Sequence, residues 1–329
     1  MPTAAQVKAL ISSHAEGDEQ RFYSVALQVA AQAARQGHNQ FAQELRDLVD
    51  RAKLGAGAAS VGQRVRPVPI AQPRGELAGL LSAAYPKTRL REMALDGAVL
   101  ARIERVLTEQ RERAQIQAHG LAPLRRLLLI GPPGVGKTMT AAALAGELSI
   151  PLFSIQLHSL ITKYLGETAA KLRLIFDAMR EARAVYLFDE FDALGTDRAA
   201  RNEVGEIRRV LNSFLLFLEQ DESDSIVVAA TNNPGLLDRA LLRRFDTVIE
   251  YGLPSQEQAG QVLRARLALL RTTTVNWEAA LDAAHGLSHA DITRACEAAA
   301  KNAILGRRTN VETGELVQAL MERRSAQGG

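Results

Sequence analysis

The sequence has 329 residues, of which 47% are hydrophobic and 23% are charged, as in a globular chain that buries a sizeable core. At about 150 residues per domain, this length predicts roughly two domains. The 40 basic and 37 acidic residues nearly balance, which argues against a nucleic-acid-binding protein. Cys296 is the single cysteine, and no apolar run approaches the roughly 20 residues that span a bilayer. We therefore expect a cytoplasmic protein with no membrane partner.

The first part of the chain is predicted to be a helical domain. In residues 1–54, apolar side chains recur at spacings of three and four, as on one face of a helix. A hairpin that only aids solubility is an alternative interpretation of this segment. Small residues and then spaced prolines follow, and they predict a linker over residues 55–75.

Between residues 76 and 253, short β-rich runs alternate with helical runs. Strands are predicted at Arg126–Ile130, Leu152–Gln156, Val185–Phe188, Ile226–Ala230 and Val248–Tyr251. Helices are predicted at Lys137–Leu148, Glu167–Ala182 and Glu203–Gln220. This alternation predicts an α/β domain with a five-stranded parallel sheet covered by helices on both faces. Residues 254–325 carry only helical patterns, and they predict a small all-helical lid domain.

A glycine-rich loop lies between a predicted strand and a predicted helix. It fits the pattern Gly-x4-Gly-Lys-Thr with Gly131, Pro132, Pro133, Gly134, Val135, Gly136, Lys137 and Thr138. Glycines let the backbone curl so that its N–H groups and the helix N-terminus face phosphate oxygens. We expect Lys137 to bridge the β- and γ-phosphates of a nucleotide, and the Thr138 hydroxyl to bind Mg²⁺. The order of strand, loop and helix makes a chance glycine turn the weaker interpretation.

Polar residues follow two of the other predicted strands and come just before a third. Asp189 and Glu190 end a buried strand, where open α/β folds bind ligands; Asp189 is expected to hold Mg²⁺ and Glu190 to polarise the attacking water. Asn232 stands at another strand tip, either to contact the γ-phosphate or the attacking water, or as a turn former. Arg243 and Arg244 offer guanidinium groups that suit phosphate, although a solvated basic turn is the alternative. Since no Asn-Lys-x-Asp motif for guanine follows, ATP is favoured over GTP.

These motifs in this order resemble the AAA family of ATPases, in its branch with the second region of homology. The similarity extends over about residues 95–305. It implies that Lys137 and Thr138 belong to Walker A, Asp189 and Glu190 to Walker B, Asn232 to sensor 1, and Arg243 and Arg244 to the arginine fingers. By the same resemblance, the protein uses ATP and Mg²⁺ in a homo-oligomeric ring, usually of six subunits, whose active sites are completed by a neighbouring subunit.

The resemblance also implies a protein substrate. Lys163, Tyr164 and Leu165 resemble the pore loop of protein-remodelling members, in which an aromatic side chain grips a polypeptide in the central channel. Residues 1–54 stand where such ATPases carry a substrate or adaptor domain. The expected function is therefore ATP-dependent protein remodelling or unfolding. The alternative is a regulatory switch whose nucleotide state controls a partner enzyme, for example a protease, without threading.

The chain departs from the family pattern in three places. Arg243 and Arg244 are adjacent, whereas many members separate the two finger arginines, so the pattern leaves open which one reaches the phosphate. His289 replaces the usual glycine of Ser-Gly-Ala-Asp, and it is either a base-stacking residue or a surface histidine. Residues 93–97 stand near the place of the adenine pocket without its usual sequence, so the adenine contacts stay open.

Overall fold

The computed structural model describes residues 26, 29, 30, 43, 73, 75–160, 165–191, 203–233, 235 and 242–327. The chain divides into two compact units, Met1–Pro67 and Val68–Gly329. In the first unit the described residues are all helical, namely Ala26, Val29, Ala30 and Gln43. The rest of the predicted helical segment 1–54, and almost all of the predicted linker, lie outside the described residues.

The second unit is built on a six-stranded sheet. Its strands are β1 (Leu81–Ala84), β2 (Arg126–Ile130), β3 (Leu152–Ile155), β4 (Val185–Phe188), β5 (Ile226–Thr231) and β6 (Thr247–Glu250). They lie in the order β1-β3-β4-β5-β2-β6, in which β1 runs antiparallel to β3 and the other neighbours are parallel. The α/β prediction is thus confirmed, and all five expected strands are present. The edge strand β1 was not predicted because only Leu81 of its residues is buried, so it has no apolar run.

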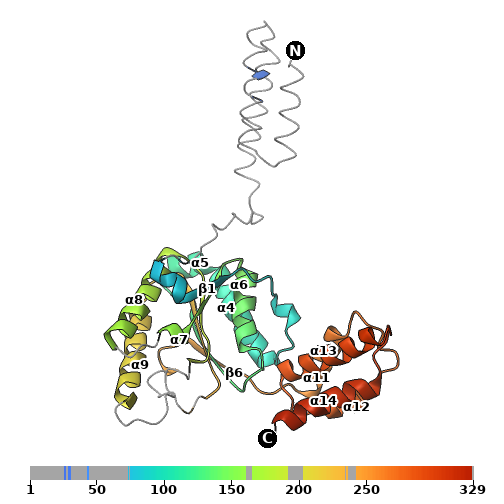
Figure 1. Cartoon of the computed structure of the whole chain (residues 1–329). Helices are drawn as coiled ribbons and strands as arrows, with labels where there is room; N and C mark the ends of the chain where they lie inside the picture. The colour runs from blue at the N-terminus through green and yellow to red at the C-terminus, as the bar shows by residue number, and fades with distance from the viewer. Residues whose placement is uncertain are drawn as a thin grey trace. The chain divides into compact units, whose positions relative to one another are not determined.

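Helices cover both faces of this sheet (Figure 1). α4 (Gly97–Arg111) and α6 (Lys137–Leu148) pack on one face, and α8 (Leu165–Glu181) and α9 (Glu203–Gln220) on the other. Alternate strand residues serve the two cores: Leu128 belongs to the α8–α9 side, and Leu127 and Leu129 to the α4–α6 side. The short elements are η1 (Gly75–Gly79), η2 (Leu90–Glu92), α5 (Arg113–Ala118) and α7 (Leu157–Leu160).

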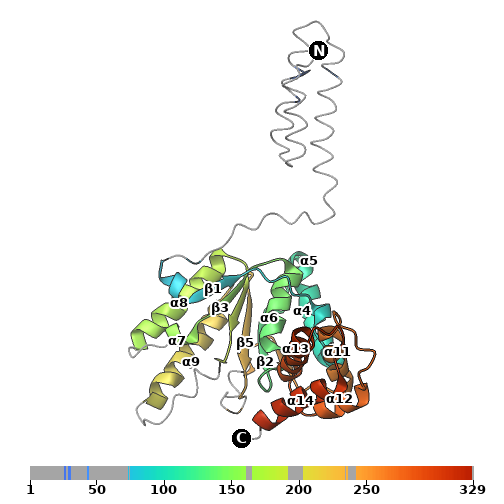
Figure 2. The same cartoon turned by 45° about the vertical axis from the view of Figure 1, so that its right-hand side comes forward.

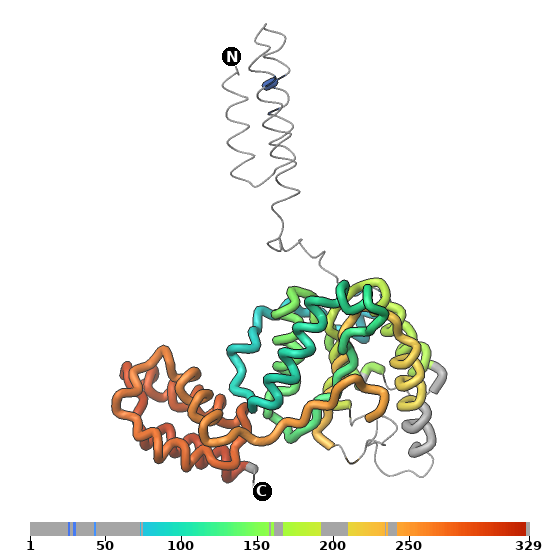
Figure 3. Tube along the Cα trace, turned by 180° about the vertical axis from the view of Figure 1, so that it is seen from behind, coloured from blue at the N-terminus to red at the C-terminus, as the bar shows by residue number. Residues whose placement is uncertain are grey.

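The C-terminal helices form a lid with a core of its own. They are α11 (Gln256–Arg266), α12 (Trp277–Ala284), α13 (His289–Leu305) and α14 (Thr313–Gln327). Figure 2 shows these helices on the side of the sheet that carries α4 and α6. Figure 3 shows from behind the segment that connects β6 to α11. The side chains of Ser255, Asn276 and Ser288 accept backbone N–H groups at the first turns of α11, α12 and α13. Among the described helices, none combines the length and the apolar character that a membrane crossing requires.

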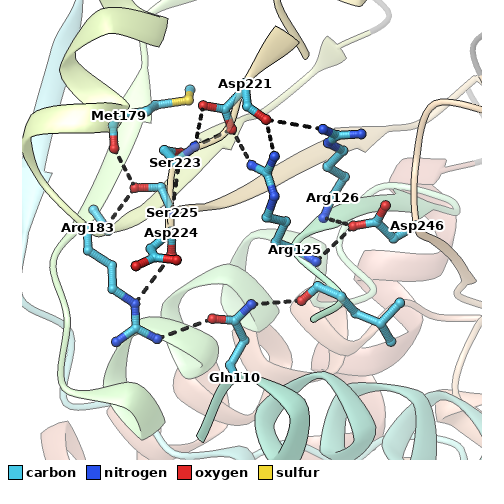
Figure 4. A network of polar contacts seen from close by, with 12 residues as sticks. Gln110, Arg125, Arg126, Met179, Arg183, Asp221, Ser223, Asp224, Ser225 and Asp246 are labelled. Atoms are coloured by element: carbon cyan, nitrogen blue, oxygen red, sulfur yellow. Dashed lines mark hydrogen bonds and ion pairs between the residues drawn. The ribbon is translucent and has the colours of Figure 1, made fainter. Parts of the chain in front are cut away.

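A polar network stabilises the end of the sheet at which β2 begins (Figure 4). The buried carboxylate of Asp221 forms an ion pair with Arg125, and it accepts hydrogen bonds from the backbone N–H of Ser223 at 3.1 Å and from its hydroxyl at 3.0 Å. Asp246 accepts the backbone N–H groups of Arg125 at 2.9 Å and Arg126 at 2.8 Å. These contacts fix the start of β2, whose other end leads into the glycine-rich loop.

Candidate active site

The glycine-rich loop between β2 and α6 is closely packed on both sides. Gly134 has a φ of 76°, in the left-handed region, and a Cβ there would lie 2.5 Å from the Ser288 hydroxyl oxygen of the lid. A Cβ on Gly131 would lie 2.5 Å from the carbonyl oxygen of Tyr251, at the end of β6. Side chains at these positions would displace backbone or the lid, so the packing, as well as the curvature of the loop, requires glycine.

Lys137 is the first residue of α6, and only 7% of its surface is exposed. Its ammonium group donates hydrogen bonds to the carbonyl oxygens of Gly131 at 2.7 Å and Pro132 at 2.8 Å. A third hydrogen bond reaches the side-chain oxygen of Asn232 at 2.8 Å, at the tip of β5. The positive charge is therefore held between the loop and the sheet edge, where it can attract a phosphate group.

Thr138 and Asp189 bring two oxygen atoms together at the end of β4. The Thr138 hydroxyl donates a hydrogen bond to Asp189 Oδ2 at 2.6 Å. Hydroxyl and carboxylate oxygens suit Mg²⁺, which is commonly bound by one or two protein groups together with substrate phosphates. The pair thus has the donor chemistry for a magnesium ion that accompanies a nucleotide.

Glu190 follows Asp189 in an uncommon backbone conformation. Its φ of 50° lies in the left-handed region, which glutamate seldom adopts. Its N–H group donates to Asp189 Oδ1 at 3.0 Å, which stabilises this turn. Such conformations persist where the surrounding structure enforces them, and they are frequent at functional sites. The turn places both acids on the same cleft.

Two consecutive asparagines follow β5 and have different surroundings. Asn232 lines the cleft and accepts the hydrogen bond from Lys137. The side-chain oxygen of Asn233 accepts the N–H of Gly235 at 3.2 Å, so this residue stabilises the turn itself. Of the two asparagines, Asn232 is therefore the one that can contact a bound phosphate.

These residues line a cleft of about 630 Å³, a volume within the range of small-molecule sites. The cleft extends from the loop to the segment before α4 and to two lid helices. From the loop and the sheet edge it takes Pro133, Gly134, Val135, Gly136, Lys137, Thr138, Asp189, Glu190 and Asn232. The loop from Pro133 onward and the acids after β4, widely separated in sequence, therefore line one cleft, whereas Gly131 and Pro132 are not among its described lining residues.

Apart from His289, the lid wall of the cleft was not predicted. It consists of Gln261, Val262, Ala265 and Arg266 of α11 and His289, Ala290, Thr293, Arg294 and Glu297 of α13. Their spacing of three and four places each set on one face of its helix. The sequence carries that periodicity, but a mixed polar face of this kind looks the same as a solvated one.

The remaining predicted site residues lie elsewhere. Arg243 and Arg244 are exposed just before β6 and, although both are described, neither is among the residues that line the cleft. Arg244 forms an ion pair with Glu219 near the end of α9. Lys163 and Tyr164 lie outside the described residues, and Leu165 is the first residue of α8.

Comparisons with known proteins identify relatives of this chain. A profile of the ATPase family associated with various cellular activities (AAA) matches residues 127–253, from β2 to just beyond β6. An uncharacterized AAA family ATPase, y4kL, of Sinorhizobium fredii (strain NBRC 101917 / NGR234) is 32% identical over 326 residues, which are 98% of this chain and 96% of that protein. The crystal structure of the FIGL-1 AAA domain superposes with a TM-score of 0.60 at 24% identity, over 76% of this chain and 90% of that one, and supports the fold alone.

Two further relatives are longer proteins. The ATP-dependent zinc metalloprotease FtsH of Acidothermus cellulolyticus is 34% identical over 241 residues, which are 70% of this chain and 36% of that protein. The proteasome-activating nucleotidase of Methanoregula boonei is 34% identical over 209 residues, or 61% and 48% of the two chains. This chain thus spans less than half the length of either relative. Because a relative at 32% identity is matched over nearly its whole length and the family profile matches the α/β part, the chain belongs to the AAA family of ATPases and is an ATP hydrolase.

Proposed function

We propose that this ATPase assembles into a homo-oligomeric ring, hydrolyses ATP with Mg²⁺ at sites shared between subunits, and remodels or unfolds proteins. One observation carries the shared site: Arg243 and Arg244, which precede β6, lie outside the cleft, whose own arginines are Arg266 and Arg294 of the lid and Arg91 before α4. Arginine is the side chain best suited to stabilise the spreading charge of phosphoryl transfer. Exposed arginines away from their own cleft are available to a neighbouring subunit.

Within one subunit, each cleft residue has a distinct role in hydrolysis. Lys137 neutralises charge on the β- and γ-phosphates, and Thr138 and Asp189 hold the magnesium ion, which neutralises developing charge when bound. Glu190 orients and polarises the attacking water. Asn232, held by Lys137 at 2.8 Å, positions that water or the γ-phosphate. The buried lysine and the close Thr138–Asp189 contact support these assignments.

The names of two relatives point to a protein substrate. One is an ATP-dependent metalloprotease and the other activates a proteasome, so both names couple an ATPase to protein degradation. In this chain, Lys163 and Tyr164 come directly before Leu165, the first residue of α8, and Tyr164 is the aromatic residue expected of a substrate-gripping loop. An aromatic side chain can contact any polypeptide without reading its sequence, because its contact is mainly apolar. We therefore assign the gripping role to Tyr164.

A substitution at Tyr164 tests the remodelling function. The Tyr164→Ala variant should keep ATPase activity within about twofold and lose most of its ability to unfold or extract a protein substrate, because only the gripping contact is removed. Tyr164→Phe keeps the aromatic ring and serves as the matched control. A substrate is first identified by trapping it on the Glu190→Gln variant in ATP. It is then fused to a fluorescent reporter protein, and unfolding is measured as loss of the reporter's fluorescence. Unimpaired unfolding by Tyr164→Ala would exclude threading.

A nucleotide-gated switch is the second candidate function. It is favoured by the name of one relative, the proteasome-activating nucleotidase, because that name describes a nucleotidase that acts on a separate enzyme. In this function, ATP binding alone controls a partner such as a protease. The Glu190→Gln variant, which should bind ATP without cleaving it, separates the two candidates. Full support of the partner by this variant indicates a switch, and loss of support indicates a motor that needs turnover.

A further inference from the structure

His289 connects the lid to the α/β part of the molecule through its side chain. It is the first residue of α13, and its Nε2 lies 2.9 Å from the carbonyl oxygen of Ala94, 195 positions earlier in the chain. The next residue, Ala290, donates its backbone N–H to the carbonyl oxygen of Gly134 at 3.0 Å. Two consecutive residues of the lid thus bind two separate segments that line the nucleotide cleft.

The hydrogen-bonding state of the imidazole follows from its surroundings. A carbonyl oxygen can only accept a hydrogen bond, so Nε2 carries the hydrogen. Nδ1 is buried and has no partner in the described part of the chain. Burial lowers the pKa of His289 below its usual value, although the hydrogen bond to Ala94 opposes this shift. The ring is therefore neutral near pH 7, with a single donor, and that donor is committed to Ala94.

His289 also lies between two cavities. Besides the nucleotide cleft, it lines a second cavity of about 430 Å³ formed by the segment 94–99, the end of β6 and the start of the lid. The two cavities therefore share His289, together with Ala94, Leu95 and Val135, as part of their walls. Movement of α13 away from the cleft must break the bond to Ala94 and open this shared wall, and the Ala290–Gly134 bond must break with it.

We propose that His289 is a latch residue: its Nε2–H bond to Ala94 holds the lid on the nucleotide cleft and slows the release of bound nucleotide. The loop and the lid both line the cleft in this arrangement, so a nucleotide that contacts both should bind the latched form more tightly. His289 acts as a positioning residue, through the lid and the segment at Ala94. The inference depends on the ATPase activity alone and is independent of ring assembly and of remodelling.

The size of the effect follows from the one bond removed. The net free energy that a partly buried hydrogen bond typically contributes corresponds to a change of about fivefold in the equilibrium constant between the latched and the unlatched lid. Nucleotide dissociation should therefore accelerate by about that factor when the donor is lost, since most changes in affinity appear in the dissociation rate. The KM for ATP should rise, whereas kcat should stay level or increase because product leaves faster.

Three variants test the latch. His289→Ala removes the donor, and His289→Gln keeps an N–H donor on a side chain of similar reach. His285→Ala removes an exposed histidine of the same lid, at the end of α12, and is the matched control. Release of ADP carrying a fluorophore on its ribose is followed by stopped flow after mixing with excess ATP. We expect about fivefold faster release for His289→Ala, and release within twofold of the unmodified protein for the other two.

Steady-state kinetics and thermal unfolding complete the test. A raised KM with undiminished kcat supports the latch, and a reduced kcat at unchanged KM overturns it. The latch is also overturned if His289→Ala releases ADP within twofold of the rate of the unmodified protein. It is overturned as well if His289→Gln releases ADP as fast as His289→Ala does. If His289→Ala lowers the melting temperature of the protein, His289→Leu replaces it, because leucine fills the space without supplying a donor.

Discussion

At the residue scale, the two consecutive asparagines after β5 allow a catalytic role to be tested apart from a structural one. Asn232 contacts Lys137 in the cleft, so Asn232→Ala should lower kcat by about 100-fold, as the loss of one positioned polar group typically does. The dissociation constant for ATP should change by no more than about threefold, because the loop and Lys137 remain. Phosphate release and a fluorescent-nucleotide titration measure the two quantities.

Asn233→Ala is the matched control for that variant. Its side chain caps the turn at Gly235 and is not among the cleft-lining residues that the structure describes, so turnover should stay within about twofold. Equal losses from both substitutions would show that the turn, and not a catalytic contact, is what hydrolysis requires.

The two arginines before β6 also differ at this scale. Arg244 is paired with Glu219, whereas Arg243 forms no ion pair or hydrogen bond within the described ranges of the chain. We therefore expect Arg243 to be the principal finger, and Arg243→Ala to lower kcat about 10³-fold while ATP still binds. Arg244→Ala should cost less, and Glu219→Gln should show whether the pairing matters. A greater loss from Arg244→Ala, measured by phosphate release, would reverse this assignment.

At the scale of elements, the start of β2 depends on a buried ion pair. Asp221 is enclosed and Arg125 nearly so, and removing one partner leaves an uncompensated charge. Asp221→Ala should therefore lower the free energy of unfolding by about 3 kcal/mol or more, measured by denaturant titration. Asp224→Ala, which removes a half-exposed carboxylate paired with Arg113, should cost less than about 1 kcal/mol. Similar losses from the two variants would contradict a special role for the buried pair.

The elements that the sequence predicted well are those with a clear apolar period. The helices α6 and α9 begin and end where the pattern places them, because one face of each is buried against the sheet. β1 was missed because a mostly exposed edge strand shows no apolar alternation. The phosphate loop was predictable because its local geometry demands a fixed pattern of glycines.

At the scale of the whole molecule, the cleft is formed by segments far apart in the sequence. The contact between His289 and Ala94 spans 195 positions, and no local pattern reports it. Most of the cleft-lining residues that the sequence singled out therefore lie at the sheet edge, where motif and strand end coincide. The lid half depends on how α11 and α13 pack, which is a property of the folded chain.

The central claim is that ATP is hydrolysed at sites completed by a second subunit, and mixing two inactive variants tests it most directly. Glu190→Gln keeps both arginines, and the double variant Arg243→Ala with Arg244→Ala keeps the whole cleft. When the two are mixed in equal amounts and allowed to exchange subunits, random assembly restores about one interface in four, so phosphate release should approach about a quarter of the unmodified rate. A mixture no faster than the mean of the two separate variants would contradict the claim.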